Sequence, residues 1–271
     1  MPSYIQIKIE NISSTESEIL IAQLSEIGFD GFEEGENFLL GYIADDKLNE
    51  DQLKKIISSH QLTYSKNLIE QKNWNEEWEK NFEPIIVNDF VAIRAHFHQP
   101  VKNVEHEIII TPKMSFGTGH HATTYMMMQQ MPSIDFKNKN VFDFGTGTGI
   151  LAILAEKLGA AKITAIDNDE WSISNASENI ERNNCKNIQL LLRDSPVMLG
   201  KFDVILANIN KNVILQYLTM LVDSLIENGH LLVSGLLKED ETHILKTADI
   251  LSLKNINTIY RDKWICVKFT H

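Results

Sequence analysis

The sequence has few of the residues that build extracellular, metal-bound or membrane proteins. Its 271 residues include only two cysteines, Cys185 and Cys266, and their spacing matches no metal or redox motif. No apolar run approaches the roughly 20 residues that a membrane-spanning helix needs. The N-terminus carries Lys8 and Glu10 and does not have the pattern of a signal peptide. We therefore expect a reduced, cytoplasmic protein that contacts no membrane.

Basic residues are also scarce. The chain has 25 Lys and Arg against 37 Asp and Glu, a formal net charge of −12. Residues 1–60 contain four lysines, no arginine and twelve Asp and Glu, a balance of −8. Such a field repels phosphate backbones and attracts basic partners, so no direct nucleic-acid partner is expected. The alternative is that the acidic surface serves only solubility.

The phosphate-binding sequence G-x-x-x-x-G-K-[ST] is absent, which argues against a nucleoside triphosphatase. An apolar stretch does run into three alternating glycines, in Val141-Phe142-Asp143-Phe144-Gly145-Thr146-Gly147-Thr148-Gly149. A second apolar stretch ends in Asp167, 22 residues after Gly145. Glycines let the backbone approach a ligand, and an acid after the next strand accepts hydrogen bonds from ribose hydroxyls. The pattern predicts a nucleoside cofactor, and a tight turn without a ligand is the alternative.

The spacing of the glycines distinguishes between cofactors. A dinucleotide site requires G-x-G-x-x-G, but here the third glycine comes one residue early and Ile150 occupies the dinucleotide position. An acid, Asp143, precedes the first glycine by two residues. Acid-x-G-x-G-x-G resembles the first motif of class I S-adenosylmethionine-dependent methyltransferases.

The N-terminal part of the chain predicts a small domain and a connector. Residues 1–60 show the order strand, helix, strand, strand, helix, which suggests a ferredoxin-like α+β domain. Residues 61–83 are polar and contain Trp74, Trp78 and Phe82 at helical spacing on one face. We interpret this segment as a connector helix that docks through its aromatic face.

The sequence of residues 84–271 predicts a third segment, a larger domain. Apolar strands alternate with amphipathic helices, which indicates a parallel sheet covered on both faces. The last two strands, 255–260 and 264–269, are separated by three residues and therefore form an antiparallel hairpin. A parallel α/β sheet with this ending resembles the class I methyltransferase sheet and not the dinucleotide-binding one.

Two further polar segments follow strands of this sheet. Arg193-Asp194-Ser195 follows the third parallel strand, where methyltransferases usually place a polar group near the adenine amine; a plain polar loop is the alternative. Asn208 follows the fourth strand and resembles the first position of the [D/N]-P-P-[Y/F] motif of nitrogen methyltransferases, whose oxygens accept N–H bonds from the substrate nitrogen. Ile209-Asn210-Lys211 replace the prolines and the aromatic, which favours a flexible aliphatic amine over a planar substrate. The alternative is that Asn208 only caps the next helix.

The segment Phe116-Gly117-Thr118-Gly119-His120-His121-Ala122-Thr123-Thr124 is the most specific motif. Together with D-F-G-T-G-T-G and A-N-I downstream, it resembles the methyltransferases of ribosomal large-subunit protein eleven, the PrmA family, over nearly the whole chain. The chain departs from that family at position 120, and the histidine doublet leaves open which imidazole faces the site. A metal site at the doublet is not expected, because adjacent residues cannot easily converge and no third ligand is near.

The resemblance implies a class I Rossmann-like methyltransferase domain that uses S-adenosyl-L-methionine. It also implies a monomer that methylates lysine side chains and the N-terminal amine of a basic ribosomal protein, which the N-terminal domain recognises. Asn208 would be the catalytic residue, beside the sulfonium and the incoming amine. The alternatives are a nitrogen methyltransferase of another protein or a nucleic acid, and a cofactor-binding assembly factor without catalysis. The expected cofactor-binding residues are Phe116, Thr124, Gly145, Gly147, Asp167, Asp194, Ser195 and Asn208.

Overall fold

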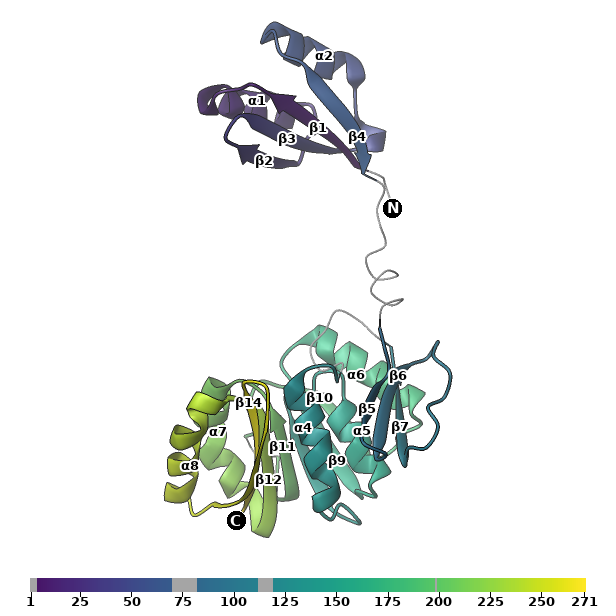
Figure 1. The fold of residues 1–271 in the computed structure, drawn as a ribbon, viewed down its shortest axis with the longest axis vertical. Coiled ribbons are helices and arrows are strands. Elements are labelled where there is room, and N and C mark those ends of the chain that lie inside the picture. Colours follow the sequence, from purple (N-terminus) through teal and green to yellow (C-terminus); the bar gives the residue numbers. More distant parts are fainter. Residues whose placement is uncertain (1–3, 70–81, 112–118, 198) are drawn as a thin grey trace. The chain divides into compact units, whose positions relative to one another are not determined.

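The computed structural model describes residues 4–69, 82–111, 119–197 and 199–271. The chain divides into two compact units, Met1–Glu77 and Trp78–His271 (Figure 1). Phe116 and the tryptophans of the expected connector helix, Trp74 and Trp78, lie outside the described residues.

The first unit is an antiparallel sheet with two helices on one face. The strands follow the order β2-β3-β1-β4. Alternate residues of β1, Ile5, Ile7 and Ile9, are buried against Leu20 of α1 and Leu53 of α2, so both helices share one core with one face of the sheet. The elements are β1 (Tyr4–Glu10), α1 (Ser14–Glu26), β2 (Gly31–Gly35), β3 (Phe38–Ala44), η1 (Asp45–Lys47), α2 (Glu50–Ser59) and β4 (Tyr64–Ile69).

Strand β4 occupies part of the segment expected to form the connector. It pairs antiparallel with β1, from Ile9 opposite Tyr64 to Tyr4 opposite Ile69. The strand lies at the edge of the sheet and is exposed along most of its length, so no alternation of apolar and polar residues marks it in the sequence. The first unit therefore extends beyond residue 60, and residues 64–69 are not part of a helix.

The second unit is built on a seven-stranded sheet of order β10-β9-β8-β11-β12-β14-β13. The first five strands of that order are parallel, whereas β14 is antiparallel to both β12 and β13. This arrangement confirms the predicted class I methyltransferase sheet with its C-terminal hairpin. The strands are β8 (Asn140–Phe144), β9 (Lys162–Asp167), β10 (Ile188–Leu192), β11 (Phe202–Asn208), β12 (Leu225–Leu237), β13 (Lys254–Arg261) and β14 (Trp264–Thr270).

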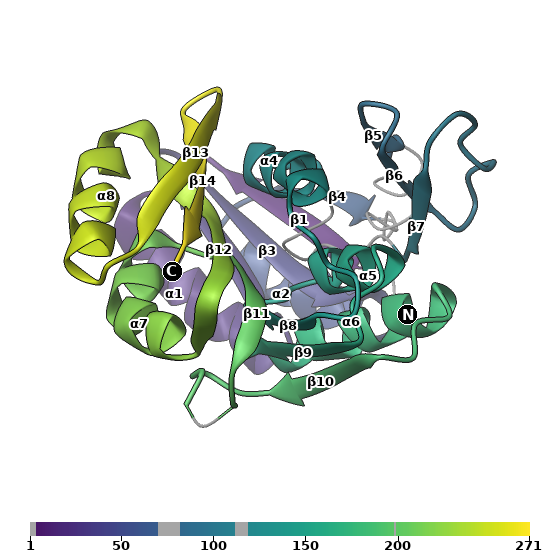
Figure 2. The same ribbon diagram turned by 90° about the horizontal axis from the view of Figure 1, so that it is seen from below.

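Helices cover both faces of this sheet, as Figure 2 shows. Successive residues of β8 enter different cores: Val141 packs with α4 and α5, and Phe142 packs with α7 and α8. Burial on both faces explains why the strands appear in the sequence as continuous apolar runs. The helices are α4 (Ala122–Gln130), η2 (Met131–Ser133), α5 (Ile150–Lys157), α6 (Glu170–Arg182), α7 (Lys211–Asp223), η3 (Lys238–Asp240) and α8 (Glu241–Ile250).

A small three-stranded sheet precedes α4. Its order is β5-β6-β7, with β5 antiparallel and β7 parallel to β6. Val87, Ile93 and Ile108 join the core that contains α4 and α5, so this sheet belongs to the second unit. Of the helices in the described parts of the chain, none is long and apolar enough to cross a membrane. The strands are β5 (Ile85–Val87), β6 (Val91–Ala95) and β7 (His106–Ile110).

Candidate functional site

A cavity of about 880 Å³ lies at the carboxyl ends of β8, β9 and β11. Its volume is in the range of small-molecule sites, and its place is where open α/β sheets bind ligands. Ser195 is not among the described residues that line it, and Phe116 lies outside the described residues. The structure brings six of the predicted site residues to its wall: Thr124, Gly145, Gly147, Asp167, Asp194 and Asn208.

The glycine turn after β8 forms one wall of the cavity. The backbone N–H groups of Gly145 and Thr146 both donate to the carbonyl of Ile166, at 3.0 and 2.9 Å, which fixes the turn to the end of β9. Gly145 has a φ of +74°, and a Cβ there would lie 2.2 Å from Cγ2 of Ile209. Only glycine fits this position, because any side chain would be strained and would collide with the residue after Asn208.

Asp167 lies at the end of β9, beside the turn. Its Oδ2 accepts the N–H of Gly147 at 2.9 Å, and its Oδ1 accepts the N–H of Asp169 at 3.1 Å. A carboxylate has about four lone-pair sites, so each oxygen can accept one further hydrogen bond. This geometry fits the vicinal hydroxyls of a ribose.

Asp143 supports the turn from inside the protein. It is fully buried and accepts a 2.6 Å hydrogen bond from the hydroxyl of Thr146. Burial raises the pKa of Asp143 to about 7; the charge of Asp167 acts in the same direction, and the hydrogen bond from Thr146 opposes it. The acid of the glycine motif therefore has a structural contact to the turn and is not among the described residues that line the cavity.

We expect Asp143→Asn to gain stability relative to the wild type as the pH rises. The folded pKa, about 7, lies above the ordinary value of 3.8, so the wild-type free energy of unfolding falls as the pH rises between these values. Asparagine carries no charge and keeps an acceptor for Thr146. The variant should therefore gain up to about 4 kcal/mol on the wild type between about pH 4 and pH 8. Urea unfolding across this range measures the difference, and a difference that does not change with pH would contradict the assignment.

Asn208 is held at the end of β11 by α4. Its Nδ2 donates to Oγ1 of the buried Thr124 at 3.0 Å, which leaves the carbonyl side of the amide as an acceptor. The N-cap of α7 is Asn210, whose side chain accepts the N–H of Val213 at 3.1 Å. The alternative that Asn208 only caps this helix is therefore wrong.

The structure distinguishes the two adjacent histidines. His121 lines the cavity and caps α4, with its Nδ1 2.7 Å from Oγ1 of Thr123. Its ring meets Trp264 edge to face, with centroids 4.7 Å apart. His120 instead packs edge to face against Phe82, and burial lowers its pKa. In the described ranges there is no group of three His, Cys, Asp or Glu that could hold a metal ion.

Several residues that line the cavity were not predicted from the sequence, among them Trp264, Tyr217 and Gly235. Trp264 reaches the cavity because β14 pairs with β12, and Tyr217 of α7 packs edge to face on Phe144 with centroids 5.5 Å apart. In the sequence both side chains follow the pattern of core residues, so no local signal distinguishes these cavity-lining residues from residues of the core. A signal did exist for Gly235, since an isolated glycine in a strand often marks a bulge or a close approach. A Cβ at Gly235 would lie 2.0 Å from the carbonyl oxygen of Ile209.

Known proteins match this chain over most of its length. The family model described as Ribosomal protein L11 methyltransferase (PrmA) matches residues 8–271. The ribosomal protein L11 methyltransferase of Phocaeicola vulgatus is 38% identical over 265 residues, which cover 95% of this chain and 94% of the relative. That of Porphyromonas gingivalis is 39% identical over 264 residues, covering 94% and 91%.

A solved structure gives the same result. The crystal structure of ribosomal protein L11 methylase from Lactobacillus delbrueckii subsp. bulgaricus matches with a TM-score of 0.65 and 30% identity, covering 69% of this chain and 98% of that one. The chain therefore belongs to the ribosomal protein L11 methyltransferase (PrmA) family and is a class I methyltransferase whose cofactor is S-adenosylmethionine.

Proposed function

We propose that this protein transfers methyl groups from S-adenosylmethionine to lysine side-chain and N-terminal amines of ribosomal protein L11 in the cytoplasm. The observation that carries the proposal is the amide of Asn208, held by Thr124 beside the glycine turn with its carbonyl side left as an acceptor. The relatives named for L11 methylation support the choice of substrate.

The cavity residues have the chemistry to hold this cofactor. Asp167 would accept the ribose hydroxyls, and Gly145 and Gly147 would let the cofactor lie against the backbone. The N–H of Arg193 donates to the carbonyl of Asp167 at 2.8 Å, so the loop after β10 lies beside the ribose position. Within that loop we assign the adenine to Asp194, which lines the cavity.

The substrate amine would be positioned by Asn208. Bound S-adenosylmethionine supplies a methyl group on a positively charged sulfur. The carbonyl oxygen of Asn208 would accept an N–H of the amine and direct the nitrogen lone pair into the cavity, which removes orientational freedom before the reaction. Thr124 would fix this orientation, because it holds the opposite side of the amide.

A lysine must be neutral to react, since an ammonium has no lone pair. Its reference pKa of about 10.4 leaves little free base at neutral pH. Transfer from water to a wall formed by Phe144, Ile209 and Tyr217 would lower that pKa, because burial disfavours the charged form. The mechanism then needs no dedicated protein base, since water can take the proton before the amine is buried.

The direct test uses the purified protein, labelled S-adenosylmethionine and purified L11, with ribosomal RNA and a ribosomal protein extract as competing substrates. We expect label on amines of L11, located by mass spectrometry, and none on RNA. Label on another protein or on RNA would replace the proposed substrate, and cofactor binding without transfer to any of these would point to a non-catalytic role.

Asp167→Ala should weaken the binding of S-adenosylmethionine by about 1.5–3 kcal/mol, roughly 10- to 150-fold, because hydrogen bonds to a charged acceptor are lost. Calorimetry measures the change. Asp203→Ala is a matched control: Asp203 also accepts a 2.9 Å backbone hydrogen bond, from Asn140, but lies at the start of β11, away from the cavity. Unchanged affinity in Asp167→Ala, or equal losses in both variants, would remove Asp167 from the ribose site.

A further inference from the structure

Asn179, on α6, connects two parts of the second unit through one side chain. The residue is fully buried. Its Nδ2 donates to the carbonyl of Thr148 at 2.9 Å, and its Oδ1 accepts the N–H of Thr111 at 2.8 Å. Thr148 belongs to the glycine turn and lines the cavity, whereas Thr111 directly follows β7 of the small sheet.

The contact to Thr148 fixes one peptide of the turn. The carbonyl of the Thr148–Gly149 peptide is held by Asn179, and its N–H donates to the carbonyl of Thr146 at 2.9 Å. The carbonyl and the N–H group of this peptide thus both form hydrogen bonds within the protein. This peptide immediately precedes α5, whose first residues, Ile150 and Leu151, line the cavity. The orientation of this peptide therefore sets the direction in which the turn and the first N–H groups of α5 point.

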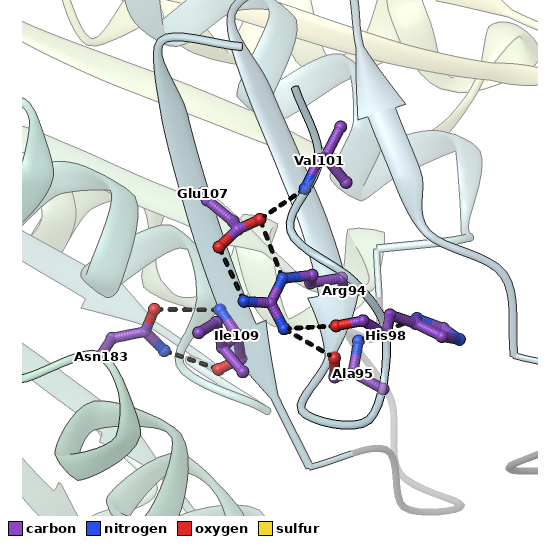
Figure 3. A network of polar contacts seen from close by, with 7 residues as sticks. All are labelled: Arg94, Ala95, His98, Val101, Glu107, Ile109 and Asn183. Atoms are coloured by element: carbon purple, nitrogen blue, oxygen red, sulfur yellow. Dashed lines mark hydrogen bonds and ion pairs between the residues drawn. The ribbon is translucent and has the colours of Figure 1, made fainter. Parts of the chain in front are cut away.

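Strand β7, which ends just before Thr111, is held by polar contacts on two sides, as Figure 3 shows. Arg94 of β6 is buried and forms two contacts with Glu107 of β7, Nε to Oε1 at 2.8 Å and Nη2 to Oε2 at 2.9 Å. Asn183 holds β7 from the side of α6: its Oδ1 accepts the N–H of Ile109 at 3.0 Å, and its Nδ2 donates to the Ile109 carbonyl at 2.6 Å. The two asparagines lie one helical turn apart, and it is Asn179 that reaches the glycine turn as well as the small sheet.

We propose that Asn179 is a positioning residue for the cofactor. It holds the Thr148–Gly149 peptide in its binding orientation and fixes the position of the small sheet relative to the glycine turn. Loss of its donor would remove the hydrogen bond to the buried carbonyl of Thr148, and a resulting rotation of that peptide would distort the wall against which the cofactor lies. Asn183 has a purely structural role, since its side-chain contacts go to Ile109 and to the backbone of α6.

Two matched variants separate these roles. Asn179→Asp and Asn183→Asp each keep the oxygen that accepts a backbone N–H of the small sheet, and each lose an amide donor. We expect both to lower the melting temperature, but only Asn179→Asp to raise the Kd for S-adenosylmethionine, by about tenfold in calorimetry at mildly alkaline pH, where the introduced carboxyl group is ionised and has no proton to donate. At acidic pH the protonated carboxyl group of the Asn179→Asp variant can again donate to Thr148, so its Kd should move back toward the wild-type value. Unchanged Kd in Asn179→Asp, or an equal rise in both variants, would overturn the proposal.

A measurement on the unmodified protein covers the case in which Asn179→Asp does not fold. If Asn179 couples the turn to the small sheet, saturation with S-adenosylmethionine should slow hydrogen exchange of the Thr111 amide by at least about fivefold, because its partner becomes more rigid. The Ile109 amide, held by Asn183, serves as the internal reference and should change less. Equal changes at both amides, or none at Thr111, would contradict the coupling. Both readouts follow cofactor binding directly, so they do not depend on which protein is methylated.

Discussion

Asn208→Ala is expected to lower kcat for L11 methylation by on the order of 100-fold while leaving the Kd for S-adenosylmethionine within about twofold of the wild type. The carbonyl of this side chain would contact the substrate nitrogen, and its effect is largest in the transition state, where the lone pair must point at the methyl carbon. In the variant the cofactor would still contact Asp167 and the glycine turn. Single-turnover methylation assays and calorimetry measure the two quantities separately.

The conservative variant Asn208→Asp sharpens this test. It keeps an oxygen that can accept the amine N–H but loses the Nδ2 donor that Thr124 holds at 3.0 Å. Its kcat should therefore lie between those of the wild type and Asn208→Ala. Equal losses of turnover and of cofactor affinity in Asn208→Ala would instead make Asn208 a cofactor-binding or structural residue.

Removal of residues 1–69 is expected to abolish methylation of L11 and to leave S-adenosylmethionine binding within about twofold. The described residues that line the cavity all belong to the second unit, whereas residues 1–60 carry −8 of the net charge of −12. We propose that this first unit docks the basic substrate, because opposite charges raise the rate of association. The deletion ends at residue 69 because β4 belongs to the first sheet.

A charge variant of the whole protein tests docking without truncation. Glu33, Glu34 and Glu36 are exposed on the β2–β3 hairpin, and their replacement by Gln should lower the association rate for L11 about tenfold at low salt and weaken its salt dependence. Stopped-flow measurements at two ionic strengths provide the readout. A truncated protein that is folded, binds cofactor and methylates L11 at the full rate would show that the first unit only stabilises the fold.

Much of the second unit could be predicted from the sequence because its signals are local. Strands β8, β9 and β11 are buried on both faces, so each appears as an apolar run, and the residues at their carboxyl ends must meet at one edge of the sheet. That rule was sufficient to predict that Gly145, Asp167 and Asn208 lie close together. Strand β4 could not be predicted in this way, because an exposed edge strand leaves no hydropathy pattern.

The strand ends, the glycine turn and the class of cofactor can all be predicted from local sequence, since the residues that specify them lie close together along the chain. The groups that complete the site become visible only once distant segments are packed together. Asn208 meets Thr124 across 84 positions, Asn179 meets Thr111 across 68, and His121 rather than His120 meets Trp264. Such contacts depend on how helices pack on the sheet and on the pairing of β14 with β12, and side-chain packing between distant segments has no periodicity that a single sequence displays.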